Sequence, residues 1–232
     1  MDPLEIQENF SLTTVNCDKT INQLFNEQNL KENDARITYF RKCSQITDTT
    51  TMSFDFYQRY LLTRQWWKDR FPNHIMSERN MKSLAESYDQ YIRTSYLIDN
   101  YSAFESSIRT ITQMYNTQKY EKLQYSFTKL IEWFMKDLNR ENPIPVFRVF
   151  TNIRNSMHSN GLFNPINQKN KEITYLDKKF VFEVGKPIPY GGWTDIFSIL
   201  KITMMEFYLI VNHDKIKQIE FVKEPYSDFW ES

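Results

Sequence analysis

The sequence predicts an all-α protein, and three observations carry this prediction. All four glycines of the 232-residue chain lie at or after position 161. The eight prolines are widely spaced, so long stretches contain neither turn-forming residue, as is typical of helices. Hydrophobic residues make up 41% of the chain and aromatic residues 16%, which favours a packed core over disorder.

Apolar residues at helical spacing indicate the main helices. The longest helix is predicted over residues 77–116 and a second over 118–139, and their short connection predicts an antiparallel pair. The first of them carries one stripe with spacings of four, three, four, three and four residues: Leu97, Tyr101, Phe104, Ile108, Ile111 and Tyr115. A third helix is predicted over 145–159. A fourth, over 194–212, is apolar on nearly every face and should therefore be buried.

Residues 1–76 are predicted to form an N-terminal helical extension to a bundle that spans residues 77–232. We expect a loose lead-in up to about residue 15. Asn16 or Asp18 can cap a helix that ends near Cys43 and is interrupted by a polar turn over residues 26–34.

A loop is predicted at Asp48-Thr49-Thr50-Thr51, because these residue types favour helix caps and turns. A further helix should run over residues 53–70 and end at Phe71-Pro72, since the residue before proline disfavours the helical conformation.

A β-hairpin is predicted near residues 172–184, inserted before the last helix. Ile173 and Tyr175 alternate with polar residues on one side of Asp177-Lys178, and the alternation resumes on the other side. Period-two alternation around a short polar tip is typical of a hairpin. The predicted fold is therefore an all-α helical bundle with an inserted β-hairpin and an N-terminal helical extension.

Charge and composition favour a protein without cofactor or metal. The 29 basic and 29 acidic residues balance, so the net charge indicates neither nucleic acid nor membrane as a partner. His74, His158 and His213 are too far apart in sequence to predict a metal site, Cys17 and Cys43 lack metal-ligand spacing, and there is no phosphate-binding glycine loop. Without a signal peptide or a sufficiently long apolar run, we expect a soluble, cytoplasmic protein with no membrane partner.

Arg154 and His158 are the candidate catalytic residues. They lie one turn apart on a helical stripe that is adjacent to the apolar stripe formed by Val146, Phe150, Ile153 and Met157. A histidine can transfer protons near neutral pH, and an arginine offers a planar fork of donors to a phosphate. Together they suffice for metal-free attack of an RNA 2′-hydroxyl on its own phosphate.

Structural interpretations of the same residues remain open. A histidine near a helix C-terminus can interact with the helix dipole. Arg154 can pair with an acid on a neighbouring helix. Asn160-Gly161 fits a helix end, where glycine takes the left-handed conformation.

Glu105 and Arg109 repeat this arrangement on the long helix, one turn apart and beside its apolar stripe. One hypothesis is that Glu105 orients Arg154 or His158 across the bundle. The alternative is a local ion pair between Glu105 and Arg109 at i, i+4 spacing.

The segment Arg154-Asn155-Ser156-Met157-His158, followed by Ser159-Asn160-Gly161, resembles the motif of the HEPN superfamily. The likeness covers about residues 77–212. Three residues separate Arg154 from His158, where the family usually has four to six. The resemblance implies a bundle of four to five helices that dimerises and acts as a metal-independent endoribonuclease. It also implies that the arginine and histidine of two subunits line one cleft.

The resemblance implies that Arg154 and His158 are catalytic. We expect Asn155 to position the phosphate, with Asn160, Glu105 and Arg109 in supporting roles. We therefore expect a homodimer that cleaves RNA at a composite dimer site. Many family members are toxins or antiviral effectors, so an antitoxin protein is a further expected partner. The alternative is a non-catalytic HEPN-like interaction or nucleotide-binding module with Arg154 and His158 in a polar dimer seam.

Overall fold

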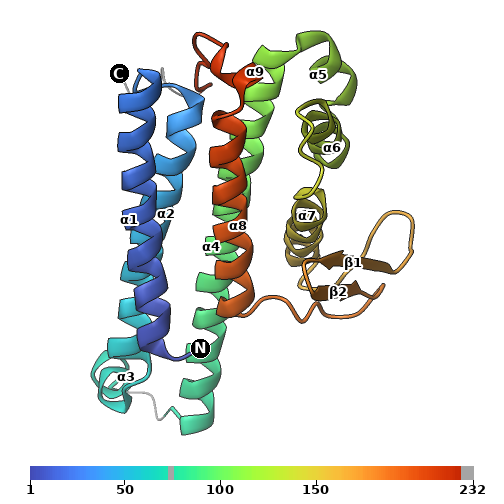
Figure 1. Cartoon of the computed structure of the whole chain (residues 1–232). Coiled ribbons are helices and arrows are strands. Elements are labelled where there is room, and N and C mark those ends of the chain that lie inside the picture. Colours follow the sequence, from blue (N-terminus) through green and yellow to red (C-terminus); the bar gives the residue numbers. More distant parts are fainter. Residues whose placement is uncertain (73–75, 226–232) are drawn as a thin grey trace.

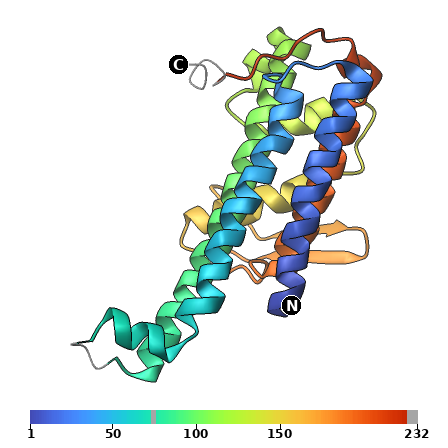
Figure 2. The ribbon, with the colours of Figure 1, turned by 90° about the vertical axis from the view of Figure 1, so that its left-hand side faces the viewer.

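Long helices dominate the computed structural model, which describes residues 1–72 and 76–225. Four of them lie side by side along the molecule: α1 (Pro3–Gln28), α2 (Ala35–Phe56), α4 (Glu78–Tyr115) and α8 (Trp193–Val211) (Figures 1 and 2). A second row packs against α4 and consists of α5 (Thr117–Leu123), α6 (Phe127–Asp137) and α7 (Ile144–His158). The predicted helical bundle is thus confirmed.

Two short helices complete the helical part. A π-helical turn at Tyr57–Leu61 ends the α2 rod and leads into α3 (Arg64–Arg70), so the predicted helix over 53–70 is in fact divided. Figure 2 shows α3 and the start of α4 projecting from one end of the bundle. At the other end, α9 (Asp214–Lys217) follows α8.

The inserted hairpin is also confirmed. Strands β1 (Lys171–Tyr175) and β2 (Lys178–Phe182) pair antiparallel, with Ile173 opposite Phe180. The turn residues are Leu176 and Asp177, one position earlier than the predicted tip, and Leu176 has a φ of 50°. The hairpin packs beside α7 (Figure 1).

One continuous core joins the N-terminal helices to the rest. The ring of Phe10, on α1, makes edge-on contacts with Phe54, Tyr96, Trp193 and Phe197, which come from α2, α4 and α8. Such aromatic pairs stabilise a core beyond the area that they bury. The predicted boundary between an N-terminal extension and the bundle at residue 76 remains a prediction, because these ring contacts do not test it. Within the described residues, no helix is both long and apolar enough to cross a membrane.

The expected lead-in over residues 1–15 is wrong, because α1 begins at Pro3. The Asp2 side chain accepts hydrogen bonds from the backbone N–H groups of Leu4 and Glu5, and the Glu5 side chain accepts one from the Asp2 N–H. This capping box, with proline at the first helical position, is a sufficient start signal. The predicted polar break after this helix is confirmed, since α1 ends at Gln28 and α2 begins at Ala35.

The loop predicted at residues 48–51 is also wrong, since α2 runs through it. The threonine hydroxyl groups of this segment donate to carbonyl groups four residues earlier: Thr49 to Gln45, Thr50 to Ile46 and Thr51 to Thr47. A threonine that bonds back in this way remains helical instead of capping a new helix.

The helix predicted over 118–139 is two helices. The predicted helix is interrupted at Ser126, which is the N-cap of α6. The Ser126 side chain accepts a hydrogen bond from the N–H of Lys129. The carbonyl oxygen of Gln124 in this break accepts a hydrogen bond from Arg109 Nη1 at 2.6 Å. A side chain thereby satisfies a backbone group that the break would otherwise leave unpaired.

A left-handed glycine ends α7, which confirms the predicted helix end. Gly161 has a φ of 80°, and its N–H donates to the Ser156 carbonyl at 2.9 Å.

A Cβ at Gly161 would have no neighbour within 4 Å, so Gly161→Ala should cost only the backbone strain, about 1–2 kcal/mol of unfolding free energy. Gly191→Ala is the matched control, since its φ lies outside the left-handed region and a Cβ there would meet only the Met157 side chain, at an ordinary 3.7 Å. Urea unfolding should show no loss for the control, and equal losses for both would contradict this account.

Candidate functional site

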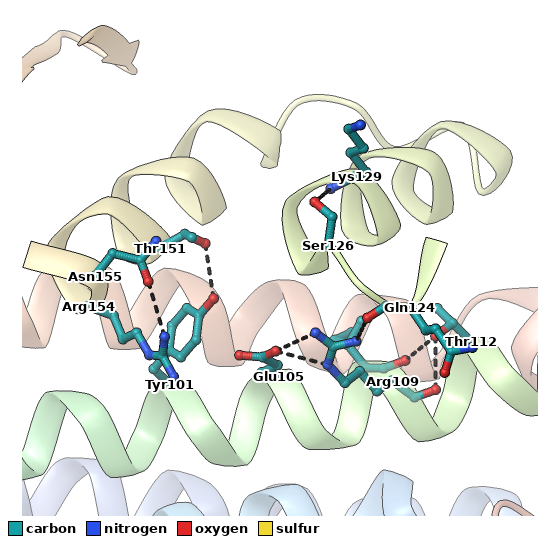
Figure 3. Close-up of polar contacts among 11 residues, drawn as sticks. Tyr101, Glu105, Arg109, Thr112, Gln124, Ser126, Lys129, Thr151, Arg154 and Asn155 are labelled. Atoms are coloured by element: carbon teal, nitrogen blue, oxygen red, sulfur yellow. Dashed lines mark hydrogen bonds and ion pairs between the residues drawn. The ribbon is translucent and has the colours of Figure 1, made fainter. Parts of the chain in front are cut away.

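The candidate site lies on the exposed side of α7. Val146, Phe150 and Ile153 are buried and Met157 is half-buried, which confirms the predicted apolar stripe. On the adjacent side of the helix, Arg154 faces Tyr101 of α4 (Figure 3). The side chain of Arg154 is half-buried, whereas His158 is exposed.

The Arg154 guanidinium lies over the ring of Tyr101, with its carbon 5.3 Å from the ring centroid. Its Nη1 donates to Asn155 Oδ1 at 3.1 Å, and its Nε is buried without a hydrogen-bond partner (Figure 3). No carboxylate of the described residues lies within ion-pair distance of it. The expectation that Arg154 pairs with an acid on a neighbouring helix is therefore not met, and an aromatic face holds this cation instead.

Tyr101 is a fixed platform for that cation. Thr151 Oγ1 donates to the Phe147 carbonyl at 2.9 Å, so the Tyr101 hydroxyl is the donor in its 3.2 Å contact with Thr151. Burial raises the pKa of Tyr101 to about 12, with Glu105 contributing in the same direction against the opposing effects of Thr151, Arg154 and Arg109. Tyr101 therefore stays protonated near neutral pH and keeps this bond.

His158 is the last residue of α7 and one turn beyond Arg154. Its imidazole makes no hydrogen bond or ion pair with any residue that the structure describes. Both ring nitrogens are thus accessible to a ligand. A histidine at this position also lies at the negative end of the helix dipole, as the structural interpretation expects.

Glu105 and Arg109 form the local ion pair. Arg109 Nη2 lies 2.6 Å from Glu105 Oε1, and Arg109 Nε donates to the same oxygen at 2.9 Å. In Figure 3 the Glu105 carboxylate faces Arg109, and it makes no hydrogen bond to Arg154 or His158 within the described chain. The hypothesis that Glu105 orients either catalytic candidate is therefore not supported. The structure contains the alternative, a local ion pair between Glu105 and Arg109.

Asn155 and Asn160 differ in their relation to the site. Asn155 is exposed and contacts the Arg154 guanidinium, so the structure brings these two together. Asn160 lies beyond the end of α7 with a φ of 54°, where it belongs to the helix-terminating turn. Of the other histidines, His213 caps α9 through its Nδ1, and His74 lies outside the described residues.

A further polar stripe, which was not predicted, runs along α7. Arg148, Thr151, Asn155 and His158 are spaced three, four and three residues apart, so they lie along one face. At the Arg148 end of this stripe, α6, α7 and β1 surround a pocket of about 480 Å³. The spacing could have identified the stripe, but the pocket depends on how the hairpin docks, which local patterns do not encode.

Comparisons with protein-family models, curated proteins and solved structures found no match.

The described residues contain no cluster of three or more side chains arranged to hold a metal ion. Three groups on this face could take part in a reaction: a fixed guanidinium, an accessible imidazole and an exposed amide. An arginine can bind and neutralise a phosphate, and an imidazole can exchange a proton with a reacting oxygen.

Proposed function

We propose that the chain is a metal-independent, HEPN-like endoribonuclease that cleaves RNA at Arg154 and His158. The observation that supports this most is the guanidinium of Arg154, which is held against Tyr101 without a carboxylate partner, one turn from an accessible imidazole. A cation that no protein anion neutralises is suited to a phosphate that gains charge during reaction.

The reaction is a transesterification within the RNA strand. His158 takes the proton of a 2′-hydroxyl, whose oxygen attacks the adjacent phosphorus. The bond to the 5′-oxygen breaks, and that oxygen takes a proton from a second acid. Arg154 stabilises the charge of the pentavalent phosphorane, and Asn155 positions the phosphate. The products are a 2′,3′-cyclic phosphate and a 5′-hydroxyl.

A homodimer supplies the second proton-transfer group. Each chain contributes one His158, so a site shared by two subunits contains both a base and an acid. This arrangement requires the α7 faces of two copies to meet near the exposed His158. As a ribonuclease of this kind, the protein would act as a toxin or antiviral defence component in the cytoplasm and be restrained by an antitoxin protein.

A non-catalytic module is the second candidate, and one observation favours it. Asn155 already accepts a hydrogen bond from Arg154, as expected in a polar seam between subunits or at a nucleotide-binding surface. Such a protein would bind RNA or a nucleotide, or associate with itself, without cleaving RNA.

The test uses purified protein and end-labelled single-stranded RNA in excess EDTA. We expect cleavage products with 2′,3′-cyclic phosphate and 5′-hydroxyl ends, and no cleavage of the same RNA with 2′-O-methyl groups. Products with 5′-phosphate ends would contradict the proposed chemistry. Binding of the RNA without any cleavage would favour the non-catalytic module.

A further inference from the structure

A pocket of about 480 Å³ lies between the hairpin and the helices α6 and α7. Its polar lining includes Arg148, Thr151, Asn152, Asn170, Lys171 and Glu132. The volume is within the range of small-ligand sites. The pocket lies at the opposite end of the α7 polar stripe from His158.

Lys171 is a half-buried cation without a carboxylate partner. Its Nζ donates to Asn152 Oδ1 at 3.1 Å and lies 5.7 Å from the centre of the Phe163 ring. No Asp or Glu of the described residues lies within 4.0 Å of this Nζ. A charge that is partly removed from water and not paired is unfavourable, unless a ligand supplies the opposite charge.

The carboxylates around the pocket are engaged by other cations. Glu132 Oε1 accepts from Arg148 Nε at 2.7 Å. Glu172 lies 2.8 Å from Lys179, across the hairpin. Neither pair uses Lys171, so its charge remains uncompensated.

The hydrogen-bond donors of the pocket also remain available. Arg148 uses only Nε in its contact with Glu132, which leaves Nη1 and Nη2 without a partner in the described chain. Asn152 is 6% exposed and accepts from Lys171, while its Nδ2 makes no hydrogen bond to any described residue. Burial, and secondarily the positive charge of Arg148, lowers the pKa of Lys171, because both disfavour its protonated form.

We infer that this pocket binds a phosphate group, through Arg148, Lys171 and the amide of Asn152. Phosphate satisfies several donors at once and supplies the negative charge that Lys171 lacks, and arginine is well suited to its geometry. The phosphate belongs either to an RNA strand or to a small phosphorylated ligand. Arg148 and Asn155 lie on the same stripe of α7, seven residues or about 10 Å apart along the helix axis, so one strand can contact both. Phosphate binding is inferred from the residues of the pocket alone. Only the assignment of the phosphate to an RNA strand rests on the proposed function.

The test measures binding of a fluorescent 2′-O-methyl RNA octanucleotide, which cannot be cleaved, and of inorganic phosphate. Anisotropy reports the first, and the NMR shift of the Lys171 side chain reports the second. We expect Lys171→Met to weaken octanucleotide binding by about tenfold or more and to make its salt dependence shallower. Lys171→Arg, which keeps the charge, should retain most of the affinity.

Lys169→Met is the matched control, because Lys169 is exposed in the loop that leads into β1 and does not line the pocket. It should change affinity by less than about twofold, since isolated exposed charges contribute little. Circular dichroism checks that each variant is folded. The absence of a Lys171 shift with phosphate would overturn the inference. Equal octanucleotide binding by the Lys171→Met and Lys169→Met proteins would overturn its RNA source.

The outcomes also separate this inference from the proposed function. A Lys171 shift with phosphate but no octanucleotide binding supports the pocket and contradicts its RNA source. Octanucleotide binding that depends on Lys171, in a protein that does not cleave RNA, supports the pocket while the proposed ribonuclease fails.

Discussion

Replacing Asp34 with alanine should lower the free energy of unfolding by about 3–5 kcal/mol. Asp34 and Arg36 are both fully buried and form an ion pair of 2.6 Å. Asp34 Oδ1 also accepts from the N–H and Nε of Arg36, which caps α2 and orients the guanidinium. Without the carboxylate, a buried cation would lose the one ionic partner that it has among the described residues.

The pair also attaches the C-terminal segment to the turn between α1 and α2. Arg36 Nη1 donates to the carbonyls of Ile216 and Ile219, and Asp34 Oδ2 accepts from the N–H of Val222. The variant should therefore loosen residues around 216–222 together with the start of α2. Hydrogen exchange of these amides should increase before that of the α4 core.

Urea unfolding followed by circular dichroism measures the effect. In thermal unfolding, the Tm of the variant should be lower than that of the wild type by about 6–20 °C. Glu32→Ala is the control: it removes a carboxylate from the same turn, but its side chain is 84% exposed and 3.8 Å from Arg41. We expect about 1 kcal/mol or less there. The account of the pair is wrong if the two variants are destabilised equally.

Replacing Arg154 with glutamine should slow RNA cleavage by about 10²–10³-fold, the usual effect of removing a donor to a developing charge. The loss should be mainly in kcat, since the contact strengthens in the transition state. Arg154→Lys keeps the charge over Tyr101 but loses the planar fork, so it should restore only part of the rate.

Arg79→Gln serves as the control for Arg154, because Arg79 is an exposed residue at the start of α4. It should cleave RNA at the wild-type rate. Wild-type kcat in the Arg154→Gln protein, with only KM increased, would show that Arg154 binds the strand without stabilising the reaction.

Much of the fold could be predicted from the sequence because its signals are local. The absence of glycine before position 161 and the stripe from Leu97 to Tyr115 are sufficient for a long helix, which α4 is. The errors have equally local causes. Asp2 and Glu5 form a capping box that the prediction overlooked, and the threonines after Asp48 bond backwards within α2 instead of capping a helix.

The candidate site could be predicted only in part. Helical spacing is sufficient to place Arg154 and His158 on one face, but it does not specify what Arg154 contacts. Tyr101, on another helix, holds the guanidinium, whereas Glu105 pairs with Arg109. Lys171 comes from the hairpin, and its approach to Asn152 depends on tertiary packing. Such contacts between distant segments have no periodic signal.

The cleavage rate of the His158→Asn protein in EDTA tests the proposed ribonuclease most directly. Asparagine keeps the polarity and approximate size of the side chain but cannot exchange a proton, so the rate should fall by about 10²–10⁴-fold. His213→Asn is the matched control, because asparagine can also cap α9 there, and it should cleave RNA as the wild type does. Cleavage by His158→Asn at the wild-type rate would contradict the proposed mechanism.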